Sequence, residues 1–205
     1  MNVSASTSAI PGTAQFNTIT QAVPAEQITS PVSPIKSIYV FGEVNESISR
    51  EIIQELVEHN WETTTHMHIF ICTEGGNLHD CFAIIDFIEN IKVQFGIHIC
   101  SFGLGEVVSA GFLLFLLGDT RVMFPNCRMF VHEHITINQE TQTYGQRLKA
   151  DKGEEKNVYQ LYVNYITRRL GITMRKSKTL LRKCDWLSEK DIVSYNIVPR
   201  IKENE

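Results

Sequence analysis

Residues 105–118 have the sequence GEVVSAGFLLFLLG, around which the rest of the chain is organised. A strand-like run at residues 97–102 precedes them, and their second half, residues 112–117, is an uninterrupted apolar run that suits a short helix. Ser109 therefore stands at a predicted strand-to-helix turn, in the first turn of the helix. Free backbone N–H groups and the positive end of the helix dipole converge at such a turn, so they would stabilise a negative charge that develops on a bound carbonyl oxygen.

The hydroxyl group of Ser109 has two interpretations. A serine between small residues at a turn often serves only packing, or caps the N-terminus of a helix. Two other stretches favour catalysis, because Gly75-Gly76 follows the strand-like run 67–72 and His132 closes the strand-like run 128–132. A glycine turn can donate a backbone N–H to an oxyanion, and a histidine can act as a general base. Together the three features predict acyl transfer.

From residue 35 onward, strand-like runs alternate with helical stripes. Strands are predicted at residues 38–41, 67–72, 97–102, 121–124 and 128–132, and helices at residues 48–57, at 78–91 and after Ser109. This alternation is typical of βαβ units with right-handed crossovers, so an α/β fold is expected.

Residues 139–170 form a long polar segment in which only the second half has helical spacing. The apolar stripe of that half consists of Val158, Leu161, Tyr165, Ile166 and Leu170. A projecting amphipathic helix needs a partner for such a stripe, so the segment predicts an oligomer.

The composition is that of an ordinary globular protein, with 43% hydrophobic and 20% charged residues, and 205 residues suit one domain. A net charge of −4 argues against nucleic acid or an anionic membrane as partner, and the longest apolar run is too short to span a bilayer. Five cysteines without a C-x-x-C pair indicate reduced thiols and a cytoplasmic protein. Residues 1–34, rich in Ser, Thr, Ala and Pro, predict a flexible N-terminal arm or propeptide.

Four blocks of the sequence, in this order, resemble the ClpP family of proteolytic subunits of the ATP-dependent Clp protease. They are the Gly75-Gly76 turn, residues 105–111, residues 125–132 (PNCRMFVH) and residues 186–189 (WLSE). The resemblance implies a ClpP/crotonase-like spiral of ββα units as a peptidase domain at residues 35–205. Residues 139–170 would be the handle that interleaves two stacked rings. The implied function is that of a serine endopeptidase that cleaves unfolded polypeptides delivered by a AAA+ unfoldase.

The resemblance also assigns the site residues. Ser109 corresponds to the nucleophile and His132 to the general base, and the backbone N–H groups of Gly76 and Ala110 correspond to the oxyanion hole. These last two roles belong to the backbone, so alanine in place of the family's usual methionine costs little.

The third member of the triad departs from the family pattern. The family's aspartate falls on Cys184, and Asp185 follows one residue later. In a strand, a shift of one residue points a side chain to the opposite face. Either a local bulge restores Asp185 to His132, or the base works without its usual orienter.

No metal or cofactor is expected. The pairs His66/His68 and His132/His134 could each share one face of a strand. Apart from Glu133, which would face away in a regular strand, no carboxylate or cysteine lies at a recurrent ligand spacing nearby. The sequence has no G-x-x-x-x-G-K-[ST] loop, so ATP would be used only by a partner unfoldase.

Partner recognition is a second departure. In ClpP, aromatic residues on the strand before the glycine turn and near the end of the next helix hold a loop of the unfoldase. Phe70 keeps one aromatic ring, but the matching positions His68 and Asn90 are polar. The resemblance thus implies a divergent subunit of homo-oligomeric or mixed stacked rings, for which docking of a standard Clp ATPase is open.

Two other functions are compatible with the sequence. Cys184 and the altered pocket also fit a catalytically weak or inactive ring subunit with a role in assembly. A crotonase-type enzyme acting on acyl-CoA thioesters shares the fold and the backbone oxyanion hole, but its chemistry has no necessary role for Ser109 and His132.

Overall fold

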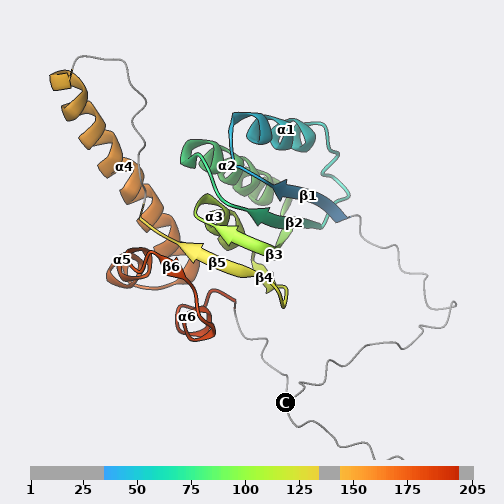
Figure 1. Ribbon diagram of the computed structural model, residues 1–205. Helices are drawn as coiled ribbons and strands as arrows, with labels where there is room; N and C mark the ends of the chain where they lie inside the picture. Colours follow the sequence, from blue (N-terminus) through green and yellow to red (C-terminus); the bar gives the residue numbers. More distant parts are fainter. Residues whose placement is uncertain (1–34, 134–143, 199–205) are drawn as a thin grey trace, which may run out of the picture. The chain divides into compact units, whose positions relative to one another are not determined.

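The computed structural model describes residues 35–133 and 144–198, which fall within one unit spanning residues 33–205. The elements of this part, in chain order, are β1 (Ile35–Phe41), α1 (Glu46–Val57), β2 (His66–Thr73), α2 (Leu78–Phe95), β3 (His98–Val108), α3 (Ala110–Leu116), β4 (Thr120–Met123), β5 (Arg128–Val131), α4 (Tyr144–Leu170), α5 (Met174–Arg182), β6 (Asp185–Trp186) and α6 (Glu189–Ser194) (Figure 1). The predicted N-terminal arm, residues 1–34, and the start of the predicted handle, residues 139–143, lie outside the described residues.

The strands form one sheet in the order β1-β2-β3-β5-β6, and β4 also pairs with β3. All neighbouring strands are parallel except β6, which runs antiparallel to β5. β3 pairs with β4 along residues 100–103 and with β5 along residues 106–108. The strand predicted at residues 97–102 is therefore too short, because β5 supplies hydrogen-bond partners for a second half of β3. Ser109 follows this second half directly.

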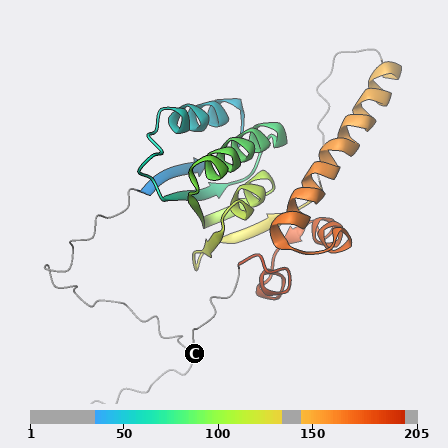
Figure 2. The same ribbon diagram turned by 180° about the vertical axis from the view of Figure 1, so that it is seen from behind.

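The helices α1, α2 and α3 lie on one side of the sheet (Figures 1 and 2). Side-chain burial alternates along β2, as expected for a sheet with helices on one side. Met67, Ile69 and Ile71 are fully buried, whereas His68 and Phe70 are only half-buried. Every residue of α3 is buried. The helix that begins after Ser109 is therefore enclosed along its whole length, and packing fixes where it starts.

Helix α2 begins with a side-chain cap. Asn77 Oδ1 accepts hydrogen bonds from the backbone N–H groups of His79 (2.8 Å) and Asp80 (3.2 Å), and the helix ends at Gly96 in the left-handed region (φ 65°). The cap follows the Gly75-Gly76 turn directly, so this turn is held between the end of β2 and a capped helix.

Helix α4 differs in two ways from the prediction for residues 139–170. It begins at Tyr144, well before the stretch with helical spacing. In addition, most of its predicted apolar stripe is already buried within the chain, since Val158, Tyr165 and Ile166 are at most 5% exposed. Only Leu161, 56% exposed, remains of that stripe as an open apolar side chain. The stripe therefore packs intramolecularly and does not by itself require a second subunit.

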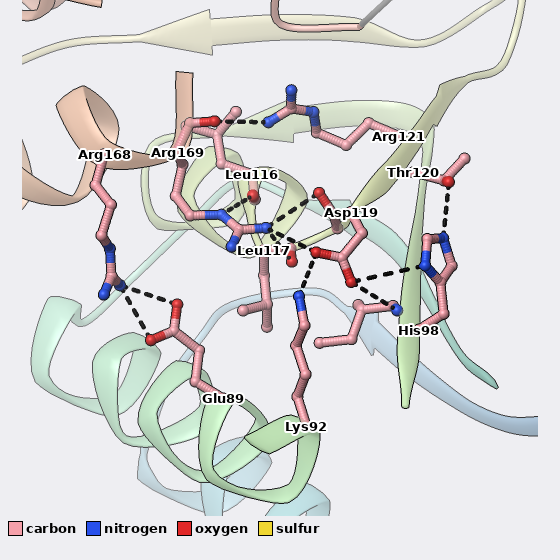
Figure 3. A network of polar contacts seen from close by, with 12 residues as sticks. Glu89, Lys92, His98, Leu116, Leu117, Asp119, Thr120, Arg121, Arg168 and Arg169 are labelled. Atoms are coloured by element: carbon pink, nitrogen blue, oxygen red, sulfur yellow. Dashed lines mark hydrogen bonds and ion pairs between the residues drawn. The ribbon is translucent and has the colours of Figure 1, made fainter. Parts of the chain in front are cut away.

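Arg169 of α4 holds the C-terminal end of α3 (Figure 3). Its guanidinium group donates to the carbonyl oxygens of Leu116 (2.7 Å), Leu117 (2.5 Å) and Gly118 (3.1 Å). These carbonyls have no partner within the helix, so the arginine satisfies acceptors that would otherwise be buried without a donor.

Asp119 completes this network. Its carboxylate accepts hydrogen bonds from Lys92 of α2 and from the backbone N–H of Ile99, and it lies 3.9 Å from Arg169. Burial alone would raise the pKa of Asp119, but the hydrogen bonds and the nearby positive charges outweigh it, so the pKa is lowered overall. The network thus ties α2, α3 and α4 to the start of β4.

Arg169→Ala is expected to lower the free energy of unfolding by about 2–3 kcal/mol, because buried carbonyl oxygens lose a charged donor. Denaturant unfolding at one fixed protein concentration measures the change. Arg168→Ala is the matched control, since the Arg168 side chain is 62% exposed and pairs with Glu89 at 2.9 Å, a contact worth less than about 1 kcal/mol. Equal losses in the two variants would contradict the capping role.

Candidate active site

Ser109 occupies a strained backbone conformation at the junction of β3 and α3. Its φ of 53° and ψ of −115° are unusual for a residue with a side chain. Its side chain makes no capping hydrogen bond to the helix, so the capping interpretation of this serine is not what the structure shows. Such strain at a strand-to-helix turn is typical of a nucleophile whose hydroxyl group must stand clear of the backbone.

Main-chain hydrogen bonds fix Ser109 in this conformation. Its N–H donates to the carbonyl oxygen of Phe130 in β5 at 3.0 Å, and its own carbonyl accepts from Phe112 N–H at 3.0 Å. The next residue but one, Gly111, packs against Thr73, since a Cβ atom placed on it would lie 2.3 Å from Thr73 Cγ2. The nucleophile turn is therefore held by β5 on one side and by the end of β2 on the other.

The Gly75-Gly76 turn lies against the start of α3. A Cβ atom on Gly75 would lie 2.7 Å from Ser109 Cβ and 3.2 Å from Ala110 N, so no other residue type fits there without a shift. Gly76 has a φ of 144°, and Val44 binds the turn from both sides, donating to Gly75 O and accepting from Asn77 N–H, each at 2.7 Å. The structure thus brings the turn next to the serine.

The two predicted oxyanion donors are free to bind a ligand. Gly75 N–H is engaged by Thr73 Oγ1 at 2.9 Å. In contrast, within residues 35–133 and 144–198 no acceptor is found for the N–H of Gly76 or of Ala110. Ala110 is the first residue of α3, where the helix dipole adds a partial positive charge. Two unengaged N–H groups of this kind can stabilise the oxyanion that forms on a carbonyl oxygen when a serine attacks it.

His132 follows β5 as Ser109 follows β3. Val108 pairs with Phe130, so the serine and the histidine leave neighbouring parallel strands at the same edge of the sheet. His132 Nδ1 lies 2.6 Å from the carbonyl oxygen of Glu133. Because a carbonyl oxygen only accepts, a hydrogen bond at this contact requires a proton on Nδ1; in the neutral ring, Nε2 then carries the lone pair that a general base needs.

Asp185 lies close to His132 in the fold, but its carboxylate is turned to another partner. β6 pairs antiparallel with β5, with Asp185 opposite Val131. Asp185 Oδ1 accepts a hydrogen bond from Trp186 N–H at 2.7 Å, and no hydrogen bond joins Asp185 to His132 among the residues described. Cys184, the position of the family's aspartate, lies just before β6; it is exposed, has a φ of 47°, and its N–H donates to the carbonyl oxygen of Leu181 at 3.2 Å. The structure therefore does not bring the Asp185 carboxylate to the histidine.

Asp191 stabilises the segment that follows β6. It forms a capping box with Ser188 at the start of α6 and an ion pair with Lys183, the residue before Cys184. The hydrogen bonds from Lys183 and Ser188 lower the pKa of Asp191 from 3.8 to about 2. This carboxylate thus anchors the chain on either side of β6.

Asp191→Asn is expected to cost about 1–2 kcal/mol of unfolding free energy at pH 7. The pKa of Asp191 is lower in the folded than in the unfolded chain, so its contribution is complete above about pH 4–5 and is lost as the pH falls toward 2. Denaturant unfolding at several pH values measures the difference between the variant and the wild type. Glu189→Gln, an exposed carboxylate on the same helix, is the control; a difference for Asp191→Asn that does not shrink in acid would contradict the assignment.

The rings of His66 and His68 both contact other rings on neighbouring strands. His66 stacks edge-on with His98 at 5.6 Å between ring centroids, and His68 packs edge-on against Phe102 at 5.1 Å. No group of three or more His, Cys, Asp or Glu residues that could hold a metal ion is found in the part of the chain that is described. His134, the second member of the predicted pair with His132, lies outside the described residues.

A row of aromatic rings runs across β1, β2 and β3. Tyr39 stacks on Phe70 at 5.3 Å, and Phe70 stacks on Phe102 at 4.8 Å. Tyr39 is 60% exposed. The sequence pattern identified Phe70 alone, because only the strand register reveals that rings from three strands are neighbours. The polar side chain of His68 lies beside this aromatic row.

Among the residues described, no helix is both long and apolar enough to cross a membrane.

Comparisons with known proteins place this geometry in a family. A model of the family described as Clp protease matches residues 21–205. The ATP-dependent Clp protease proteolytic subunit 2 of Treponema denticola is 25% identical over 177 residues, which are 82% of this chain and 82% of that protein. The subunit of the same name from Pseudomonas aeruginosa is 22% identical over 169 residues, covering 82% and 81% of the two chains.

The fold agrees with a solved structure of that family. ClpP1 of Listeria monocytogenes, solved as an asparagine-to-aspartate mutant, superposes with a TM-score of 0.68 at 21% identity. The match covers 82% of this chain and 92% of the other. The predicted α/β fold of the ClpP type is thereby confirmed. From the matched family model, its two relatives and the shared fold, we conclude that this chain is a divergent member of the Clp protease family.

Proposed function

We propose that this chain is the serine endopeptidase subunit of a self-compartmentalised ring protease that cleaves unfolded polypeptides. The observation that carries the proposal is the strained Ser109, with two unengaged N–H groups beside it and a histidine at the neighbouring strand end. Ser-His pairs with a backbone oxyanion hole perform acyl transfer on several unrelated folds.

The residues present suffice for each chemical step. His132 Nε2 takes the proton of Ser109 as its oxygen attacks the peptide carbonyl, and the N–H groups of Gly76 and Ala110 bind the resulting oxyanion. His132 then gives the proton to the leaving amine, and water hydrolyses the acyl-enzyme. The proposed mechanism uses no metal or cofactor, and the five free thiols favour a reducing compartment such as the cytoplasm.

A fluorophosphonate probe tests this proposal on the purified full-length chain. We expect stoichiometric labelling at Ser109, located by mass spectrometry, no labelling in Ser109→Ala, and only slow residual labelling in His132→Ala. Native mass spectrometry of the same sample reports whether a ring is present. An assembled ring without labelling would refute the peptidase proposal.

An assembled ring in which Ser109 is not labelled would identify an inactive ring subunit. The observation that favours this alternative is that, among the residues described, no carboxylate hydrogen-bonds to His132, and the Asp185 carboxylate accepts from Trp186 N–H instead. A mixed ring in which an active partner subunit carries the labelled serine would then be the expected assembly.

We also propose that the aromatic row, Tyr39, Phe70 and Phe102, docks an apolar loop of a AAA+ Clp ATPase, which alone would consume ATP. Three exposed or half-exposed stacked rings offer such a loop an apolar surface despite the polar His68. Tyr39→Ala should abolish ATP-dependent protein degradation but leave cleavage of a short peptide intact. Loss of both activities would place the aromatic row in assembly instead.

A further inference from the structure

We propose that Glu133 is the positioning residue for the candidate base His132, in the place of the family's aspartate. This inference rests on the proposed peptidase function. Among the residues described, no carboxylate hydrogen-bonds to His132: the Asp185 carboxylate accepts from Trp186 N–H, and Cys184, at the position of the family's aspartate, lies outside β6 with a φ of 47°. A catalytic histidine needs a partner at Nδ1 that fixes both its tautomer and its ring orientation.

The main-chain carbonyl of Glu133 supplies that partner. It accepts a hydrogen bond from His132 Nδ1 at 2.6 Å. A carbonyl oxygen holds the same tautomer as a carboxylate would, with Nε2 free to take a proton. It carries no full charge, however, so it stabilises the imidazolium ion of the transition state less than an aspartate does. The expected result is a working base of reduced power.

The side chain of Glu133 is what holds this carbonyl in place. Glu133 Oε1 accepts from Tyr159 Oη of α4 at 3.3 Å and from Arg182 Nε of α5 at 3.4 Å. Glu133 lies beyond the last residue of β5, so no strand pairing restrains its peptide group. The hydrogen bonds from Tyr159 and Arg182 to the Glu133 side chain restrain this residue instead.

The ion pair between Glu133 and Arg182 adds little to the stability of the fold. We therefore assign the Glu133 side chain a role in positioning. The side chains of Glu133 and Arg182 are 47% and 70% exposed, and such pairs add at most about 1 kcal/mol of stability. A small displacement of a catalytic base can nevertheless cost about 100-fold in rate. Removing the Glu133 side chain should therefore affect the rate far more than the fold.

Kinetic measurements in the wild-type and His132→Ala backgrounds test the inference. We measure the rate at which a fluorophosphonate acylates Ser109 and the kcat and KM for a short peptide in Glu133→Ala, Glu133→Gln and the control Glu106→Ala. We expect Glu133→Ala to lower the acylation rate and kcat by about 10- to 100-fold with KM unchanged. Glu133→Gln, which can still accept both hydrogen bonds, and Glu106→Ala, which removes an exposed carboxylate from β3, should stay within about threefold.

The double variant with His132→Ala separates positioning from general damage. If Glu133 acts through His132, Glu133→Ala should not lower the acylation rate any further in a chain that already carries His132→Ala. An equal loss in both backgrounds, or no loss in either, would overturn the inference.

A measurement that does not depend on activity decides the tautomer. Magic-angle-spinning NMR of sedimented full-length protein with ¹⁵N-labelled histidine, with the His132 signals identified by His132→Gln, distinguishes a protonated from an unprotonated ring nitrogen. We expect the Nδ1–H tautomer in the wild type and a mixture in Glu133→Ala. The Nε2–H tautomer in the wild type would overturn the inference, whereas an unlabelled Ser109 would refute only the peptidase proposal.

Discussion

Replacing Ser109 with glycine is expected to make the folded chain more stable and at the same time inactive. Glycine adopts the backbone conformation found here, φ 53° and ψ −115°, without the steric cost that serine bears, so the free energy of unfolding should rise by about 1–2 kcal/mol. Loss of the nucleophile should lower kcat by about 10⁵- to 10⁶-fold. Denaturant unfolding and hydrolysis of a short peptide measure the two effects on the same samples.

Ser109→Ala separates the two effects. It removes the hydroxyl group but keeps the Cβ atom that causes the strain, so it should be as inactive as Ser109→Gly and no more stable than the wild type. Asn196, which also has a φ of 53°, provides a control away from the site: Asn196→Gly should change stability by less and leave activity intact. A destabilised Ser109→Gly would show that the serine is not strained.

Gly76→Ala is expected to damage both the oxyanion hole and the fold. Its φ of 144° is closed to other residues, and the new Cβ atom would lie 2.1 Å from the carbonyl oxygen of Val44, so the turn must move. We expect a loss of about 3 kcal/mol or more in unfolding free energy. Displacement of an oxyanion donor should lower the rate of Ser109 acylation by about 10²- to 10³-fold.

Gly42→Ala is the matched control for this substitution. Gly42 has a φ of 76°, yet no atom lies within 4 Å of the Cβ position. Alanine should therefore lower the free energy of unfolding only by the backbone strain, about 1–2 kcal/mol. Comparison of the two variants by denaturant unfolding and fluorophosphonate labelling isolates the contact with Val44. Retained acylation in a folded Gly76→Ala chain would exclude the Gly76 N–H as an oxyanion donor.

Local patterns were enough to place most of the candidate site. The apolar run 112–117 after a small-residue turn predicted the junction at Ser109, and the glycine pair predicted the turn beside it, because both depend on backbone preferences of neighbouring residues. The catalytic roles of Ser109, His132, Gly76 and Ala110 stay predictions until labelling tests them. Their common position at one edge of the sheet follows from the parallel strand register.

Local sequence patterns could not predict contacts between segments that are distant in the sequence. The second half of β3 is a strand because β5, some twenty residues later, pairs with it, and residues 103–105 of β3 carry two glycines that weaken the local signal. Helix α5 was not predicted, since its buried apolar residues are few. The apolar stripe of α4 looked unpartnered because α3, against which α4 packs, lies about thirty residues earlier in the sequence.

The family, the α/β fold and the residue types available for catalysis follow from local motifs and hydrophobic spacing in the sequence. Which groups surround His132 depends on the tertiary structure. The Asp185 carboxylate accepts from Trp186 N–H rather than from the histidine, and two helices far along the chain hold Glu133. Strand register and side-chain direction arise from packing over the whole domain, and no local pattern encodes them.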